Sequence, residues 1–287
     1  MTRRGCWVTL AAALAAASLL LSGCGMRSGN AGITIEAPKM TSGETTKRVT
    51  VNEDQVREGD LVLINQAHPI PAGYVPDGLV NVYEEPGRAG RYALLDGSIR
   101  LPERLLRQFS DMVDAAAKDG VDHFIISSGY RDNEAQQALY EEKGADTALP
   151  AGHSEHNLGL SLDIGSTLKE MDKAPEGKWL KNNAWKHGFI LRYPKDKTDI
   201  TGIRYEPWHF RYVGLPHSAI MHRKDITLEE YLSYLKDRRT IAATVGGEKY
   251  EISYVPVRGS ASIEVPAGRP YDISGDNSGG VIVTIKL

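Results

Sequence analysis

Both cysteines of this 287-residue chain, Cys6 and Cys24, lie within its first 24 residues. The remainder of the chain has no thiol, which excludes a disulfide framework, a cysteine-ligated zinc ribbon and a cysteine nucleophile there. Its fold must therefore rest on a hydrophobic core, and any metal site in it must be built from histidine and carboxylate side chains. The length allows one large domain or two modest ones, with enough residues to bury a core without disulfides.

Composition excludes several other classes of protein. Hydrophobic residues make up 41% of the chain and charged residues 25%, which is typical of a globular protein and not of a disordered, collagen-like or multi-span membrane chain. The formal net charge is −3, so there is no basic surplus of the kind that nucleic-acid-binding proteins carry. We therefore expect a globular protein with no nucleic-acid partner.

The N-terminus has the pattern of an export signal. Arg3 and Arg4 precede an almost wholly apolar stretch over residues 7–21, which is shorter than the ~20 residues that a membrane span needs. Small residues occupy the two positions before Cys24, as in a bacterial lipobox. This predicts a lipoprotein signal peptide over residues 1–23 and lipidation of Cys24, the alternative being an ordinary signal peptide with a chance cysteine. The mature protein would then be exported and lipid-anchored on the outer face of the cytoplasmic membrane.

Three further segments follow the signal peptide. Residues 24–57 are rich in glycine, serine, threonine and asparagine without a sustained period, which predicts a flexible tether. Residues 58–239 combine helices and strands without a regular βαβ alternation, which favours an α+β domain. Residues 240–287 contain alternating runs separated by glycine turns, which predicts a small β-rich C-terminal appendage that either binds wall polymer or packs on the domain.

Local patterns place the elements of the α+β domain. Helices are expected where apolar residues recur at spacings of three and four, and strands where short apolar or alternating runs lie between turn residues. Thr227 and Glu230 have the spacing of a capping box at the last helix. The expected helices span residues 102–119, 133–143, 178–187 and 227–238, and the expected strands span residues 61–65, 123–128, 159–164, 189–193 and 205–213.

Two clusters contain the side chains that carry chemistry, one at residues 152–163 and one at residues 206–209. A catalytic zinc ion takes three protein ligands from histidine and carboxylate side chains and leaves one position for water. His156, Asp163 and His209 supply such a set, and Glu206 supplies a carboxylate that can act as a general base. No His-Glu-x-x-His helix is present, so the helical zinc-peptidase pattern is absent.

The residues alone leave a simpler alternative open, because a Trp-His pair on a strand more often packs in a core than binds a metal. Glu206 and His209 are three positions apart, so an unbroken strand would point them to opposite faces. Pro207 favours a break or bulge between them, which would allow both to face the same site.

The same clusters resemble the signature of the M15 zinc peptidases. Ser154-x-His156-x6-Asp163 followed by Glu206-x-Trp208-His209 is similar to the VanY-type D,D-carboxypeptidases and their L,D-carboxypeptidase relatives. Further segments of the same pattern follow in the same order, and the resemblance covers roughly residues 60–237. They lie at residues 63–65, 128–131, 188–194 and 206–214.

The resemblance implies a fold and a role for each matching residue. The fold would be a small antiparallel sheet flanked by helices, of the Hedgehog/D,D-peptidase-like kind. His156, Asp163 and His209 would bind Zn²⁺, and Glu206 would be the base that activates water and passes its proton to the leaving amine. Arg131 would contact the substrate carboxylate or the oxyanion. Gln136 (or its neighbour Gln137), Ser154 and Trp208 fall at substrate-contacting positions, whereas His153 is expected to be a loop residue.

The expected function is removal of the C-terminal D-residue from peptidoglycan stem peptides by a zinc D,D-carboxypeptidase. Its partners would be the stem peptide and, through the lipid anchor, the membrane, and the chain is expected to be a monomer. One alternative is an L,D-carboxypeptidase that acts on tetrapeptide stems. Another is a non-catalytic lipoprotein that binds wall peptide, although the intact set of ligands and base disfavours a degenerate copy.

Overall fold

A computed structural model describes residues 32–37, 45–87, 90–144 and 148–287 of the chain. The predicted signal peptide and the predicted lipidation site Cys24 lie outside the described residues. In the part of the chain that the structure does describe, no helix has both the length and the apolar character needed to cross a membrane.

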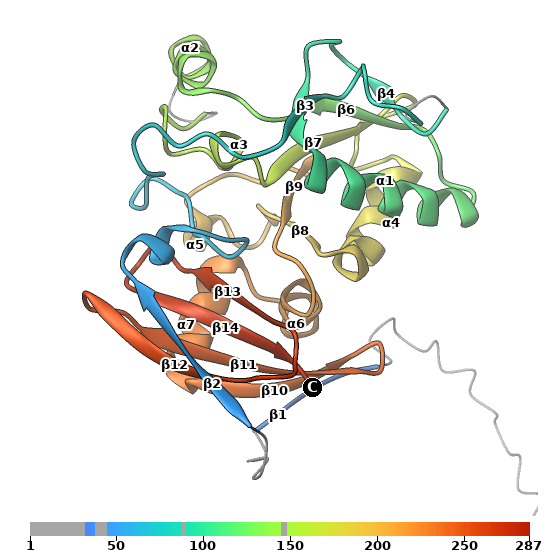
Figure 1. Cartoon of the computed structure of the whole chain (residues 1–287). Helices are drawn as coiled ribbons and strands as arrows, with labels where there is room; N and C mark the ends of the chain where they lie inside the picture. The colour runs from blue at the N-terminus through green and yellow to red at the C-terminus, as the bar shows by residue number, and fades with distance from the viewer. Residues whose placement is uncertain (1–31, 38–44, 88–89, 145–147) are drawn as a thin grey trace, which may run out of the picture. The chain divides into compact units, whose positions relative to one another are not determined.

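The α+β region is built on a five-stranded sheet with strand order β4-β6-β7-β9-β8 (Figure 1). The β4–β6 pair is parallel, and the pairs β6–β7, β7–β9 and β8–β9 are antiparallel. This is the predicted arrangement of a small, mainly antiparallel sheet flanked by helices. The strands are β4 (Ala93–Leu94), β6 (Phe124–Ser128), β7 (Ser161–Ser166), β8 (Phe189–Leu191) and β9 (His209–Tyr212).

Helix α1 (Glu103–Lys118) covers one face of this sheet because its apolar residues share one side. Phe109 and Met112 are fully buried there, in one cluster with Phe124 of β6 and Leu162 of β7. Burial of large apolar side chains is worth about 1.5–3 kcal/mol each, so this cluster fixes the helix on the sheet. The remaining helices are α2 (Asn133–Lys143), α3 (Glu155–Leu158), α4 (Pro175–Asn183), η2 (Ala184–His187), α5 (Thr198–Thr201), α6 (His217–Lys224) and α7 (Leu228–Arg238).

The predicted capping box is present at α7. The Oγ1 of Thr227 accepts the backbone N–H of Glu230 at 3.3 Å, and the Glu230 carboxylate accepts the N–H of Thr227 at 2.8 Å. These reciprocal bonds satisfy two amides that the first turn of a helix leaves without partners. The helix therefore begins where the sequence predicts.

The strand predicted at residues 61–65 is wrong. The segment is largely buried, but the one β-bridge that it makes with the described residues is an isolated one between Asn65 and His68. Two backbone carbonyls at the start of this segment bond to a side chain instead of a strand. Arg211 donates to the carbonyls of Asp60 and Val62 at 2.9 Å each. A short hairpin pairs β3 (Leu79–Asn81) with β5 (Arg100–Pro102) further along the chain.

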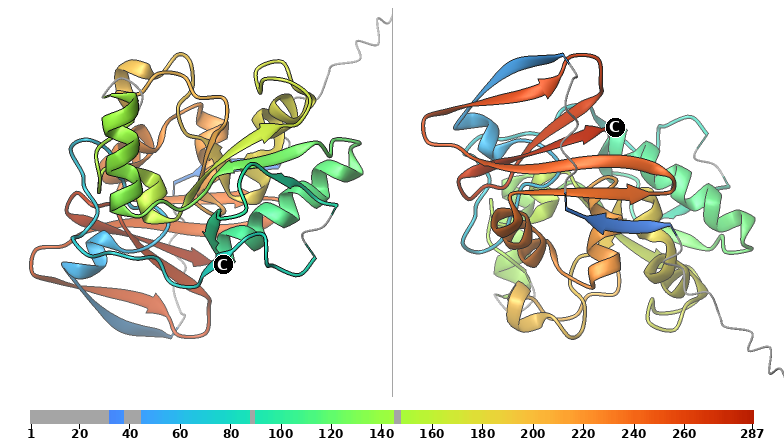
Figure 2. Two further views of the ribbon diagram at one scale, coloured as in Figure 1. Left: turned by 90° about the horizontal axis from the view of Figure 1, so that it is seen from above. Right: turned by 90° about the horizontal axis from the view of Figure 1, so that it is seen from below.

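The second sheet contains the C-terminal strands, in the order β1-β10-β11-β14-β13, with every pair antiparallel. Figure 2 shows β1, in blue, alongside the orange β10. A separate ribbon pairs β12 with β2. The strands are β1 (Ile33–Glu36), β2 (Thr46–Asn52), β10 (Thr240–Val245), β11 (Glu248–Pro256), β12 (Ser260–Pro266), β13 (Tyr271–Gly275) and β14 (Gly280–Lys286).

The predicted tether over residues 24–57 is therefore wrong in its described part. Residues 33–36 form β1, residues 46–52 form β2, and the 3-10 helix η1 (Asp54–Arg57) follows. Val51 is fully buried in one cluster with Val257, Val265 and Val281 of the C-terminal region. These strands are stabilised by pairing with residues about 200 positions later in the chain. The local sequence pattern of residues 24–57 therefore could not predict them.

The β-rich C-terminal region shares a core with the helices that precede it. Leu228 and Tyr231 of α7 are fully buried in one cluster with Ile252 of β11 and Ile282 of β14. The same cluster includes Ile220 of α6 and residues Leu61 and Leu63 of the segment before β3. Residues 240–287 consequently pack on the α+β region through an apolar interface.

Candidate active site

Three potential metal ligands meet where α3, β7 and β9 come together. His156 lies on α3, Asp163 on β7 and His209 at the start of β9, and their ligand atoms all lie within 4.8 Å of one another. Asp163 is opposite His209 in the β7–β9 ladder, so the register of the sheet sets this pair. The ligands predicted from two separate sequence clusters are thus brought together by one sheet and one short helix.

His156 is held by two local contacts. Ser154 caps α3, and its Oγ accepts the backbone N–H of His156 at 3.3 Å. The Nδ1 atom of His156 lies 2.7 Å from the carbonyl oxygen of Gly129. Because a carbonyl only accepts hydrogen bonds, Nδ1 carries the proton there, and the unprotonated Nε2 faces Asp163 Oδ1 at 3.4 Å.

The close approach of Gly129 depends on its missing side chain. A Cβ atom at this position would lie 2.5 Å from the carbonyl oxygen of Arg100, well inside van der Waals contact. Only glycine therefore allows the chain to pass at this depth and to present its carbonyl to His156. This explains the glycine in the segment 128–131 that the sequence singled out.

His209 and Glu206 face the same site because the chain turns at Pro207. The backbone N–H of His209 donates to the carbonyl of Glu206 at 3.2 Å, as in a turn and not as in an extended strand. His209 Nδ1 then lies 3.4 Å from Asp163 Oδ1 and 3.6 Å from Glu206 Oε2. An unbroken strand would point Glu206 and His209 to opposite faces. The turn at Pro207 removes this conflict and allows both side chains to face the site.

The three ligands fit a bound metal ion. Asp163 Oδ1 is buried and has no hydrogen-bond partner within the described ranges, although buried polar atoms are nearly always satisfied. Burial alone would raise the pKa of Asp163, but the imidazoles of His156 and His209 and the guanidinium of Arg131 lower it to about 2. The carboxylate is therefore ionised at neutral pH, and two nitrogens with one carboxylate oxygen form a donor set typical of a catalytic zinc site.

Glu206 has the environment of a general base. Its side chain is 12% exposed, and burial raises its pKa, with the imidazole of His209 opposing the shift and Asp163 adding to it. A carboxylate with a raised pKa is a stronger base than one in water. Glu206 is thus able to take a proton from a group beside the three ligands.

Arg131 is fixed at two of its three nitrogens. Its Nε donates to Gln136 Oε1 and its Nη1 to Ser128 Oγ, each at 2.8 Å. Burial lowers its pKa, while the charges of Asp163 and Glu206 act in the opposite direction. The guanidinium therefore brings a preorganised positive charge to the site.

The other predicted substrate contacts occupy different environments. Gln136 is 1% exposed, and its Nε2 donates to the carbonyl of Leu149 at 2.6 Å, so both ends of its amide bind the protein itself. Ser154 is buried as the cap of α3. Trp208 is 38% exposed and therefore accessible to a ligand. His153 bonds to the carbonyl of Asn65 at 3.1 Å and is not among the clustered ligands.

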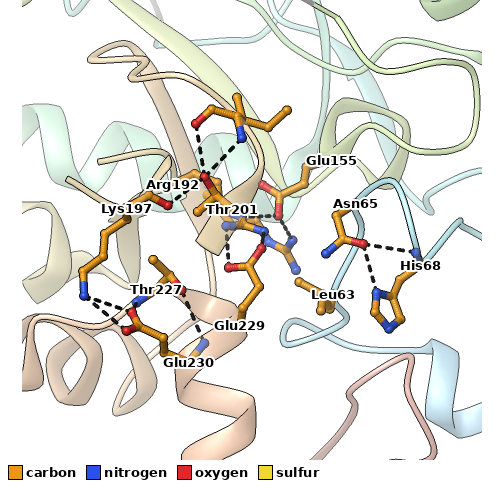
Figure 3. A network of polar contacts seen from close by, with 12 residues as sticks. Leu63, Asn65, His68, Glu155, Arg192, Lys197, Thr201, Thr227, Glu229 and Glu230 are labelled. Carbon is orange, nitrogen blue, oxygen red and sulfur yellow. Dashed lines mark hydrogen bonds and ion pairs between the residues drawn. The ribbon is translucent and has the colours of Figure 1, made fainter. Parts of the chain in front are cut away.

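A buried charge network behind His209 was not assigned a role from the sequence. Glu155 Oε1 accepts from Arg192 Nε and Arg211 Nη1 at 2.7 Å each. Arg192 lies between Glu155 and Glu229 and also pairs with both oxygens of Glu229 (Figure 3). Burial would raise the pKa of Glu155, but the two guanidinium groups hold it well below its usual value. Tyr193 adds an aromatic wall, with its ring centroid 4.8 Å from that of His209. The sequence signals for this network were the adjacency of Glu155 to His156 and the positions of Arg192 and Arg211 within the segments 188–194 and 206–214.

Known proteins share this architecture. The family model VanY, described as D-alanyl-D-alanine carboxypeptidase, matches residues 98–215. A D-alanyl-D-alanine carboxypeptidase of Enterococcus faecium is 55% identical over 242 residues, which cover 84% of this chain and 80% of that protein. The solved vancomycin resistance D,D-dipeptidase VanXYg, in complex with a D-Ala-D-Ala phosphinate analogue, is similar with a TM-score of 0.74 and 30% identity, covering 85% of this chain and 100% of that chain.

A second solved structure has a narrower overlap. It is a mutant of the vancomycin resistance D,D-pentapeptidase VanY from a VanB-type resistance cassette, in complex with Zn(II). The TM-score is 0.51 at 35% identity, and the match covers 60% of this chain and 98% of that chain.

Proposed function

The chain belongs to the family of VanY-type D-alanyl-D-alanine carboxypeptidases, and from this premise we propose that it is a zinc enzyme that removes the C-terminal D-residue from peptidoglycan stem peptides. The observation that carries the proposal is the convergence of His156 Nε2, Asp163 Oδ1 and His209 Nδ1 beside Glu206. The Zn(II) complex of a VanY relative supports the choice of metal.

In this proposal His156, Asp163 and His209 hold the zinc ion. Bound zinc supplies Lewis-acid chemistry, which lowers the pKa of water and polarises a peptide carbonyl. Glu206 takes the proton from the attacking water through its carboxylate and returns it to the nitrogen of the departing D-residue. The raised pKa of Glu206 suits it to both halves of this transfer.

We further propose that Arg131 pairs with the free carboxylate at the end of the stem peptide. Its Nε and one N–H of Nη1 already bond to Gln136 and Ser128, so among the described residues Nη2 and the second N–H of Nη1 are left to donate to a ligand. A charge-assisted hydrogen bond to a terminal carboxylate would restrict the enzyme to the last residue of the chain. A guanidinium that contacts only the oxyanion would instead permit cleavage within a cross-bridge.

We also propose that the protein acts as a monomer, exported and lipid-anchored through Cys24 on the outer face of the cytoplasmic membrane. The support for this is the lipobox-like pattern before Cys24 and the location of the substrate outside the cell. Mass spectrometry of the mature N-terminus tests the anchor, since it should carry a diacylglyceryl group on that residue. A Cys24→Ala variant that stays in the membrane fraction would contradict it.

The function is tested by incubating purified protein with pentapeptide and tetrapeptide stems and measuring released D-alanine together with bound zinc. We expect about one zinc ion per chain and release of D-alanine from the pentapeptide. Release from the tetrapeptide alone would identify an L,D-carboxypeptidase. Bound zinc and peptide without release from either would identify a wall-peptide-binding protein.

A further inference from the structure

A buried carboxylate lies behind the second histidine of the site. Glu155 Oε2 is 3.4 Å from His209 Nε2, on the side of the ring away from Asp163 and Glu206. Among the described residues His209 Nε2 is buried and has no hydrogen-bond partner, and the carboxylate of Glu155 is the acceptor that lies opposite it. The two nitrogens of this imidazole therefore face different groups, with Nδ1 turned to the metal ligands and Nε2 turned to Glu155.

The carboxylate of Glu155 is fixed on every side. Its Oε1 accepts from Arg192 and Arg211 at 2.7 Å each, and its Oε2 accepts from Ser161 Oγ at 2.9 Å. The side chains of Glu155, Arg192 and Arg211 are all fully buried. A carboxylate held by three donors cannot rotate away from His209.

The network around Glu155 is also balanced in charge. Arg192 pairs with Glu229 at the start of α7 through two bonds of 2.9 and 2.7 Å, so two guanidinium groups meet two carboxylates. Glu229 lies at the outer end of the network, with its side chain 16% exposed, and it pairs with Arg192, whereas the carboxylate that faces His209 is Glu155. Glu155 and Glu229 both bind Arg192, but only Glu155 also faces His209.

We infer that Glu155 is a positioning residue for the metal site, which keeps the proton of His209 on Nε2 and leaves Nδ1 free to bind the metal. A carboxylate only accepts, so a neutral imidazole beside it places its N–H on the facing nitrogen. Partners of this kind orient metal-binding histidines and raise their basicity. For His156 the corresponding acceptor is the carbonyl of Gly129, which faces Nδ1. His156 therefore turns Nε2 toward Asp163, whereas His209 turns Nδ1 toward it.

The inference rests on the proposed metal site and is tested first by zinc affinity. Glu155→Gln replaces the carboxylate by an amide whose N–H₂ can donate to His209, and we expect zinc to bind about 10- to 100-fold more weakly in competition with a chromophoric chelator. Glu229→Gln is the matched control, because it removes a carboxylate from the same Arg192 without touching His209. Equal losses of affinity in both variants would reduce Glu155 to a structural partner of the arginines and overturn the inference.

A second measurement is made on the wild-type protein and needs no peptidase activity. Nitrogen-15 NMR of histidine-labelled protein distinguishes the two tautomers, with the His209 signals assigned from a His209→Asn variant. In both the zinc-loaded and the metal-stripped protein we expect the proton of His209 on Nε2. A proton on Nδ1 in the metal-stripped protein would overturn the inference even if zinc binding and D-alanine release are normal, whereas failure of wild-type protein to bind zinc would overturn the proposed function instead.

Discussion

At the scale of single residues, the site is organised around one unsatisfied oxygen. Asp163 Oδ1 is 3.4 Å from a nitrogen of each histidine and has no hydrogen-bond partner among the described residues, so two imidazole nitrogens and a carboxylate oxygen lie together without a hydrogen bond between them. Such a cluster costs free energy unless a cation occupies it. Metal binding and stability are therefore coupled in this region.

Glu206 provides the sharpest test of the chemistry. Replacing it by alanine removes the base but none of the three ligands, so we expect bound zinc to stay at the wild-type level while kcat falls at least about 10²- to 10⁴-fold. Released D-alanine and metal content are the two measurements. Glu170→Ala, which removes an exposed carboxylate, is the control that should leave both unchanged. Near-normal kcat in Glu206→Ala would refute its role as the base.

Gln136 tests whether Arg131 must be preorganised. Its amide joins Arg131 Nε to the carbonyl of Leu149, so we expect Gln136→Ala to lower kcat/KM about 10-fold, chiefly through KM, in line with the loss of a hydrogen bond to a charged group. Gln137→Ala is the control, since that side chain bonds to the exposed Glu141. A larger loss in the control than in Gln136→Ala would assign the role to the neighbouring residue.

At the scale of elements, the prediction from sequence depended on how far apart the partners lie. The ligands could be predicted because each belongs to a short cluster whose pattern resembles that of the M15 zinc peptidases, and α7 could be placed because its capping box is local. The environment of Glu155 could not be predicted, because Arg192 and Arg211 lie 37 and 56 positions away. The ordered strands at residues 33–36 and 46–52 were missed for the same reason.

Strand β2 supplies a direct test of that correction. Val51 is fully buried in the core that β2 shares with β12 and β14, so Val51→Asp buries a carboxylate and should lower the free energy of unfolding by about 3 kcal/mol. Thr50→Asp places the same charge on the exposed face of the same strand and should cost less than about 0.5 kcal/mol. Urea denaturation measures both. Equal, small effects would mean that residues 46–52 behave as a tether after all.

At the scale of the whole molecule, a buried histidine links the helices to the C-terminal sheet. His217 of α6 bonds through Nδ1 to the hydroxyl of Tyr231 on α7 at 2.8 Å and through Nε2 to Thr284 of β14 at 3.1 Å. Burial lowers the pKa of His217 to about 4. The neutral imidazole of His217 is therefore part of the interface between the helices α6 and α7 and the C-terminal sheet.

The burial of His217 at this interface predicts that the stability of the protein depends on pH. The unfolded chain binds a proton to His217 near pH 6.5 and the folded chain only near pH 4, so its contribution is present above pH 6.5 and is lost as the pH falls toward 4. Between pH 7 and pH 4.5 the loss should be about 2 kcal/mol. Urea denaturation of wild type and His217→Gln at both pH values isolates this part, because every other group titrates in both proteins. Parallel losses in the two proteins would contradict the assignment.

The pairing of β1 with β10 and of β2 with β12 also restricts when these strands can fold during synthesis. Ile33 pairs with Val245 and Val51 with Ala261, so the first strands of the described chain wait without partners until nearly all of it has been synthesised. Contacts of such long sequence separation slow folding, and strand edges that stay open in the meantime can join those of other chains. A chain cut short before residue 240 would therefore leave β1 and β2 without the strands that they pair with.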